Sequence, residues 1–298
     1  MPTVDLSQLP QPAIIEALDF EVILAEIKQF MISRFPEELR PAVAAALELE
    51  SEPLNIIAQA FAWRELLLRQ RINDGAAACM LSHSVSTDLD NIASNMGTRR
   101  LVITPATDTT DAMMESDTAL RMRAQAAFDG LSVAGPTGAY EYFAKSASGN
   151  VADAKAVSPS PAVVVISVLS TEGDGTATPE LLATVKDALS AEDRRPVGDR
   201  LTVQSAEIVN YNINARLFFY PGPESELIQN AAHDALQAWI TLQGKIGRDV
   251  ARSAIMAALH VQGIQRVELT EPATDIVISD TQAARCASVT LEKGGTDE

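Results

Sequence analysis

The sequence predicts an α+β protein of several domains, with a helical N-terminal region followed by two mixed α/β domains. Apolar residues recur every three or four positions in the first hundred residues, which is the period of an amphipathic helix. Farther along, an apolar run at 162–169, interrupted by Ser167, and an alternating run at 209–219 both predict strands. The predicted bounds are 1–97 for the helical region, 98–114 for a linker or hinge, 115–206 for a central domain and 207–298 for a C-terminal domain.

The first long helix is expected to start after Asp19, whose carboxylate suits an N-cap. Prolines at 36 and 41 interrupt the helical pattern, and either can open a new helix. The apolar residues of this first helix form one continuous stripe: Phe20, Ile23, Leu24, Ile27, Phe30 and Met31.

A second long helix is expected after Pro53, and it is apolar on more than one side. One stripe holds Leu54, Ile57, Phe61 and Leu68, and another side holds Ile56, Trp63 and Leu67. Such a helix needs neighbours all round, either inside its own domain or in a bundle with other chains. The bundle hypothesis makes the following residues of the two helices partner-binding candidates: Phe20, Ile23, Leu24, Ile27, Leu54, Ile57, Phe61, Trp63 and Leu67.

The segment 98–114 is rich in Thr and Asp and has no apolar period, which predicts a loop or hinge. Beyond it, a helix is expected over 117–129, a Gly-Pro-x-Gly corner at 135–138 and a helix over 139–146. Strands are expected at 151–157, 162–169 and 201–205, the second of them central in its sheet because both its faces are apolar. Thr-Pro-Glu at 178–180 combines a cap, a first-turn proline and an acidic first turn, which predicts a helix start.

The alternation over 209–219 is the clearest period-two signal in the chain and indicates a strand with one wet face. A turn at 221–223 is expected to lead into a helix that ends at Gly244, and a further helix is expected over 249–260. Strands at 266–270 and 287–291 complete the C-terminal domain.

Composition narrows the class of protein. The 298 residues are 47% apolar and 21% charged, as in a soluble globular protein, and the net charge of −17 makes nucleic acid an unsuitable partner. Cys79 and Cys286 lack metal-type or disulfide-type spacing and fit a reducing cytoplasm. No signal peptide is expected at the N-terminus, and the longest apolar run is far shorter than a membrane span requires.

A search for reaction chemistry finds no catalytic, cofactor or metal site. The three histidines, His83, His233 and His260, are scattered over predicted helices and form no ligand motif. The run from Gly130 to Gly135 has one residue too many for a nucleophile elbow. The segment 172–176 lacks the spaced carboxylates of a calcium loop and is expected to be a turn.

Several short motifs, weak one by one, follow one another along essentially the whole chain in a specific order. They occupy 4–10, 49–53, 89–93, 115–117, 130–140 (Gly-Leu-Ser-Val-Ala-Gly-Pro-Thr-Gly-Ala-Tyr), 158–161 (Ser-Pro-Ser-Pro), 173–176 (Gly-Asp-Gly-Thr), 195–196, 221–226 (Pro-Gly-Pro-Glu-Ser-Glu) and 246–249 (Ile-Gly-Arg-Asp). In this series the chain resembles the baseplate assembly protein J family, the baseplate J-like wedge proteins of contractile-tailed bacteriophages.

The resemblance implies a structural protein of the virion, without enzymatic activity or cofactor, made and assembled in the host cytoplasm. It implies that two copies in each baseplate wedge join a tail protein I-type partner through their N-terminal helices. It also implies that the α/β domains pair with neighbouring copies to close a ring around the tail hub, and that a gp25-like sheath-initiating protein docks on the helical part. No nucleic acid and no membrane span are implied.

Two other classes of function stay open at this point. Tails often carry a cell-wall hydrolase, which would need a cleft with perturbed carboxylates or a metal. A host-surface binding protein would be expected to have β-rich, aromatic-rich modules, whereas aromatic residues make up only 5% of this chain.

Overall fold

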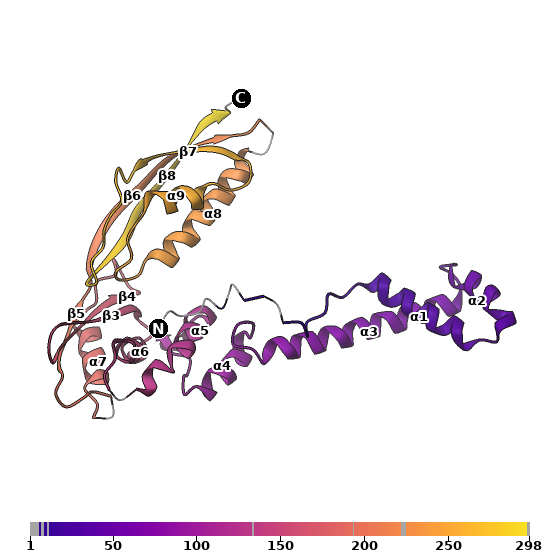
Figure 1. Ribbon diagram of the computed structural model, residues 1–298, viewed down its shortest axis with the longest axis horizontal. Helices are drawn as coiled ribbons and strands as arrows, with labels where there is room; N and C mark the ends of the chain where they lie inside the picture. Colours follow the sequence, from indigo (N-terminus) through magenta and orange to yellow (C-terminus); the bar gives the residue numbers. More distant parts are fainter. Residues whose placement is uncertain are drawn as a thin grey trace. The chain divides into compact units, whose positions relative to one another are not determined.

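The computed structural model describes residues 6, 9–10, 12–132, 134–192, 194–221 and 225–296. Most of the motif at 4–10 and most of the expected turn at 221–223 therefore lie outside the described residues. The chain divides into two compact units, Pro2–Arg99 and Arg100–Glu298. Figure 1 shows the elements in chain order. A helical region precedes a region in which helices and strands are mixed, and the predicted α+β class is confirmed.

The first unit is helical, as predicted. It contains α1 (Phe20–Arg34), a short 3-10 turn η2 (Glu37–Leu39), α2 (Arg40–Leu47), α3 (Pro53–Ala78) and α4 (Ser86–Asn95). Asp19 caps α1 as expected, because its carboxylate accepts hydrogen bonds from the backbone N–H of Glu21 at 2.8 Å and of Val22 at 3.4 Å.

Small residues on α3 let α1 approach it closely. Ile23 and Leu24 of α1 are buried against Ala58 and Ala62 of α3, which lie one turn apart on a single face. Asn73 also ties α3 to the segment before α1, since its side-chain amide exchanges two hydrogen bonds with the backbone of Glu16. These contacts fix α1 along one side of α3.

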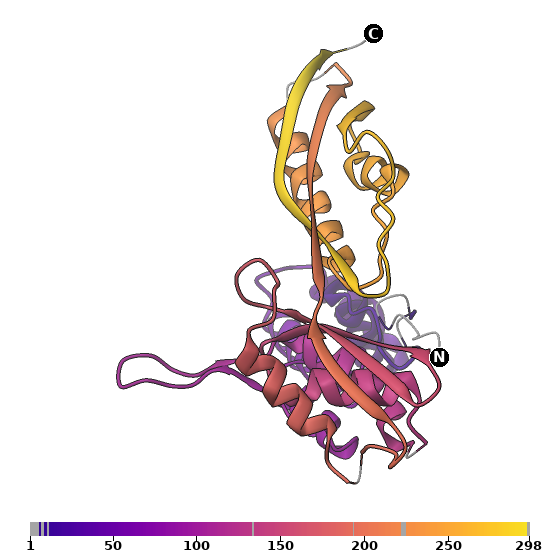
Figure 2. The same cartoon turned by 90° about the vertical axis from the view of Figure 1, so that its left-hand side faces the viewer.

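The segment predicted as a loop or hinge contains two short strands, β1 (Val102–Thr104) and β2 (Met113–Met114), which pair antiparallel. We call residues 102–114 the arm; in Figure 2 it is the narrow purple loop that leaves the body of its unit at the left. Because the division between the units falls after Arg99, the arm belongs to the second unit. The segment expected to be a loop or hinge thus contains two short strands near its ends.

The central part of the second unit contains α5 (Asp117–Ala126), the 3-10 turn η3 (Asp129–Leu131), α6 (Thr137–Ala147), β3 (Val151–Ser160), β4 (Val163–Ser170), α7 (Pro179–Leu189) and β5 (Arg200–Ser205). The sheet has the order β3-β4-β5, so β4 is central as predicted, antiparallel to β3 and parallel to β5. Thr178 caps α7, and Asp174 closes the expected turn by accepting from the N–H of Thr176 at 2.9 Å. The predicted helix over 117–129 is shorter, because α5 ends at Ala126 and a separate 3-10 turn follows.

The C-terminal part contains β6 (Glu207–Phe219), α8 (Ser225–Gln243), α9 (Arg252–Leu259), β7 (Ile264–Glu271) and β8 (Gln282–Thr296). In the sheet, of order β7-β6-β8, β6 is antiparallel to β7 and parallel to β8. The predicted alternation of β6 is confirmed, since Tyr211, Ile213 and Leu217 are buried in a core that includes residues of α8 and α9. Strand β8 is far longer than the predicted 287–291, because parallel pairing with β6 extends over its whole length.

Candidate assembly surface

Helix α3 leaves two apolar faces uncovered within its own unit. The first stripe consists of Leu54, Ile57, Phe61, Leu68 and Ile72, at helical spacing along one side. Leu54 is half-buried and the other four are exposed. The second stripe consists of Ile56, Trp63 and Leu67, all exposed. Across both stripes the exposed residues show between 45% and 62% of their surface to solvent.

The remaining solvent-facing strip of α3 is narrow. It carries the exposed Arg64 and Arg71 together with Ala60. On the side toward α1, Arg69 bonds to Glu65 one turn earlier at 2.6 Å and lies within 3.8 Å of Glu26. A soluble protein rarely exposes so continuous an apolar surface unless a partner covers it.

The candidate residues of α1 lie differently. Ile23 and Leu24 are in the core of the unit, and Phe20 and Ile27 pack against that core half-buried. Phe20 also makes an edge-on ring contact with Trp63, with 6.4 Å between centroids. The structure therefore brings the two predicted helices together through the α1 candidates and leaves Ile57, Phe61, Trp63 and Leu67 of α3 accessible.

Sequence reasoning missed the role of Ala58 and Ala62. Their spacing of four residues on an otherwise bulky helix was the available signal that another helix packs closely there. It also missed that Val22 and Phe30 of α1 are exposed.

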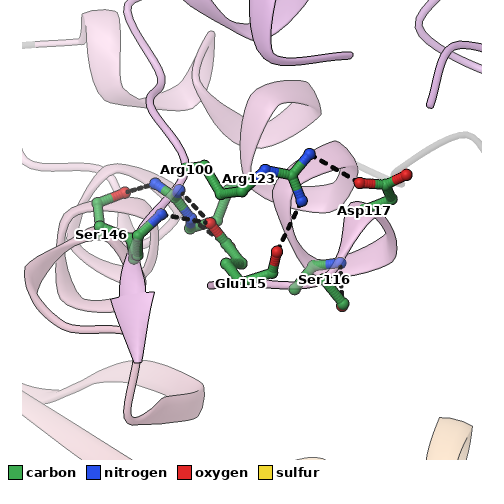
Figure 3. A network of polar contacts seen from close by, with 8 residues as sticks. Arg100, Glu115, Ser116, Asp117, Arg123 and Ser146 are labelled. Atoms are coloured by element: carbon green, nitrogen blue, oxygen red, sulfur yellow. Dashed lines mark hydrogen bonds and ion pairs between the residues drawn. The ribbon is translucent and has the colours of Figure 1, made fainter. Parts of the chain in front are cut away.

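A buried ion-pair network holds the root of the arm in the second unit (Figure 3). Arg123 of α5 donates from Nε and Nη2 to the two carboxylate oxygens of Glu115, at 2.8 and 2.6 Å. Glu115 also accepts from the N–H of Leu101 at 3.1 Å, and Arg100 donates to the backbone oxygen of Glu115 at 2.6 Å. Glu115 and Arg123 are only 6% and 7% exposed. Both strands of the arm thus start from one fixed point.

Among the residues that the structure describes, no group of three or more His, Cys, Asp or Glu side chains is placed to hold a metal ion. No helix formed by these residues has both the length and the apolar character that a membrane span requires. Of the histidines, only His233 lies in a helix. His83 lies in a turn beside Ser82, and His260 follows the end of α9, so the predicted helical positions of these two were wrong.

Comparison with known families matches the chain to three domain models in succession. A baseplate J-like N-terminal domain matches residues 50–107, a baseplate J-like central domain residues 132–205, and a baseplate J-like C-terminal domain residues 211–292. The first match contains α3 with both stripes and reaches into the arm.

A full-length relative gives the same indication. Baseplate protein J of Escherichia phage P2 is 56% identical over 302 residues, which is 100% of both chains. Among solved structures, a chain in the cryo-EM structure of the anti-feeding prophage baseplate matches with a TM-score of 0.41 and 14% identity. That match covers 61% of this chain and 43% of the other.

Proposed function

This chain belongs to the baseplate J-like family and is a structural component of a phage tail baseplate, and we propose that it builds the baseplate wedge. In this proposal it assembles with itself and with other baseplate proteins into a ring around the tail hub. Its site of action is the baseplate of the virion, after synthesis and assembly in the host cytoplasm.

The observation that carries the proposal is the pair of uncovered stripes on α3. Completing the burial of a half-exposed Ile, Leu, Phe or Trp contributes about 1 kcal/mol, so the seven exposed residues together offer somewhat less than ~10 kcal/mol. Association itself costs roughly 4 to 15 kcal/mol. The free energy gained by burying one stripe does not outweigh the cost of association. The free energy gained by burying both stripes together with the apolar surface of a partner does. We therefore propose that α3 lies inside a bundle that other chains complete on two sides.

The proposed partners follow from the family. A tail protein I-type subunit and a second copy of this chain cover the stripes, and a gp25-like sheath-initiating protein docks on the same helical unit. The second unit pairs with neighbouring copies. A homo-oligomer with closed symmetry uses one repeated contact of this kind to complete a ring.

A co-purification experiment tests the role of α3. The chain is co-expressed with its tail protein I-type partner, either as wild type or with Leu54, Ile57 and Phe61 replaced by Asp. We expect the variant to lose the partner, because three carboxylates at a bundle interface cannot be buried without counterions. A second variant, with Ile56, Trp63 and Leu67 replaced by Asp, tests the other stripe in the same way.

The matched control places three aspartates on the narrow polar strip of the same helix, as Ala60→Asp, Arg64→Asp and Arg71→Asp. It has a similar loss of helix propensity but leaves both stripes intact, so it should retain the partner. Circular dichroism confirms that each variant is folded. Partner retention by both stripe variants, at the level of the control, would contradict the proposed bundle.

A further inference from the structure

Two lysines lie near one carboxylate where the central and C-terminal parts of the second unit meet. Lys145 pairs with Asp153 at 2.7 Å, and the other oxygen of Asp153 accepts from the N–H of Ile246 at 3.0 Å. Lys245 lies near this pair, and Arg248 lies near Lys245. We call Lys145, Lys245 and Arg248 the cation cluster.

Lys245 is the lysine of the cluster that makes no ion pair among the described residues. It is half-buried, and the polar contact of its ammonium there is with the Sδ of Met122 at 3.9 Å. Burial, and after it the nearby Arg248, lower the pKa of Lys245. A half-buried cation without a hydrogen-bonding anion is costly, and a second anion at this place would remove that cost.

The arm carries the matching charge. Residues 101–114 contain Asp108 and Asp111 and no basic residue. Both aspartates are exposed, and within the described part of the chain neither contacts a basic side chain. Two hydrogen bonds between Thr107 and Thr110 order the tip of the arm. The N–H of Thr110 donates to the hydroxyl of Thr107 at 3.1 Å, and the N–H of Thr107 donates to the backbone oxygen of Thr110 at 2.9 Å.

We infer that the arm of one copy docks on a neighbouring copy, with Asp108 and Asp111 against Lys245 and Arg248. The inference rests on the proposed self-assembly of the chain and names one contact through which it occurs. The two exposed carboxylates of the arm match the two cations Lys245 and Arg248 on a protein that is otherwise strongly negative. Such charge matching fixes register and orientation between subunits.

Zero-length cross-linking of the full chain tests the contact directly. Equal amounts of unlabelled and ¹⁵N-labelled chain are mixed at high concentration and treated with a carbodiimide, which joins a carboxylate to an amine that touches it. Mass spectrometry should find the peptide 101–121 linked to the peptide that contains Lys245, in mixed-isotope pairs. Mixed-isotope pairs are formed only between copies; absence of this link, or links to scattered lysines instead, would overturn the inference.

Charge reversal tests the same contact by function. Sedimentation should show self-association weakened by at least about tenfold in Asp108→Lys/Asp111→Lys and in Lys245→Glu/Arg248→Glu. A chain with all four changes should recover, because the charges match again. The control Asp187→Lys/Glu192→Lys alters net charge equally at exposed positions away from the arm and should associate at least as well as wild type.

Two further readouts separate this inference from its alternatives. Lys245→Met should leave the melting temperature of the free chain unchanged or higher, while it weakens association; a lower melting temperature would assign Lys245 a structural role instead. The arm and cluster variants should still co-purify with the tail protein I-type partner through α3. If only the stripe variants lose that partner, the bundle of α3 and the arm contact are shown to be separate. If the chain with all four charge reversals does not recover self-association, the arm contact alone is refuted.

Discussion

The buried ion pair of Arg123 and Glu115 gives the sharpest stability prediction. Replacing Arg123 with Met removes two hydrogen bonds to Glu115 and one to Ser146. Glu115, which is only 6% exposed, then keeps the hydrogen bond from the N–H of Leu101 but loses its ion-pair partner Arg123. Breaking a buried pair from one side costs about 3 to 5 kcal/mol. For a unit of this size each kcal/mol moves Tm by about 2–4 °C, so a loss on the order of 10 °C is expected.

The assay is thermal and urea unfolding of the full chain, monitored by near-UV and far-UV circular dichroism. The control is Arg216→Met, which breaks the solvent-exposed pair with Glu292 at 3.3 Å in the same unit and should cost under about 1 kcal/mol. In the double variant Arg123→Met/Glu115→Gln the stranded charge is gone, so part of the lost stability should return. If Arg123→Met unfolds with the same midpoint as Arg216→Met, the pair does not hold the arm and the reasoning is refuted.

Three further outcomes are expected. A nonspecific protease should cut the free chain early at 105–112 and spare the root of the arm; early fragments cut elsewhere would contradict this. Ile23→Ala should cost about 2–5 kcal/mol in urea unfolding, because it opens a cavity between α1 and α3; the exposed Ile57→Ala is the control and should cost well under about 1 kcal/mol. Burial, and then its hydrogen bond to Asp199, raise the pKa of Tyr140 above the usual value of about 10. Wild type should therefore lose stability faster than Tyr140→Phe as pH rises above about 10, and parallel pH profiles would contradict this.

Elements with a strong local signal could be predicted from the sequence. The alternation of β6, the cap at Asp19 and the helix start at Thr178 all depend on neighbours a few residues away. The two exposed stripes of α3 are of the same kind, because the period of a helix alone places Ile57 and Trp63 on different sides.

Elements that depend on distant partners could not be predicted. The strands of the arm are three and two residues long, too short to show a period-two pattern. The hydrogen bonds of Glu115 with Arg123 and Leu101 hold their base. Strand β8 gains its length from parallel pairing with β6, far away in sequence. That Ile23 faces its own unit, and not a partner, depends on the alignment of α1 with Ala58 and Ala62.

The net charge of −17 sets a condition on assembly that separates the two proposed contacts. Copies of this chain repel each other at long range, so contacts between them must be apolar or locally charge-matched. Salt shortens the screening length from about 10 Å at 0.1 M to about 3 Å at 1 M. Added salt should therefore strengthen association through the stripes of α3, by removing the repulsion, and weaken the contact of Asp108 with Lys245, which depends on charge. The yield of the arm cross-link in wild type, and the self-association through α3 of the Asp108→Lys/Asp111→Lys variant, should move in opposite directions across a salt series. If both quantities change in the same direction, the two contacts depend on the same kind of force. That result would contradict the proposal that α3 associates through apolar surface and the arm through charge.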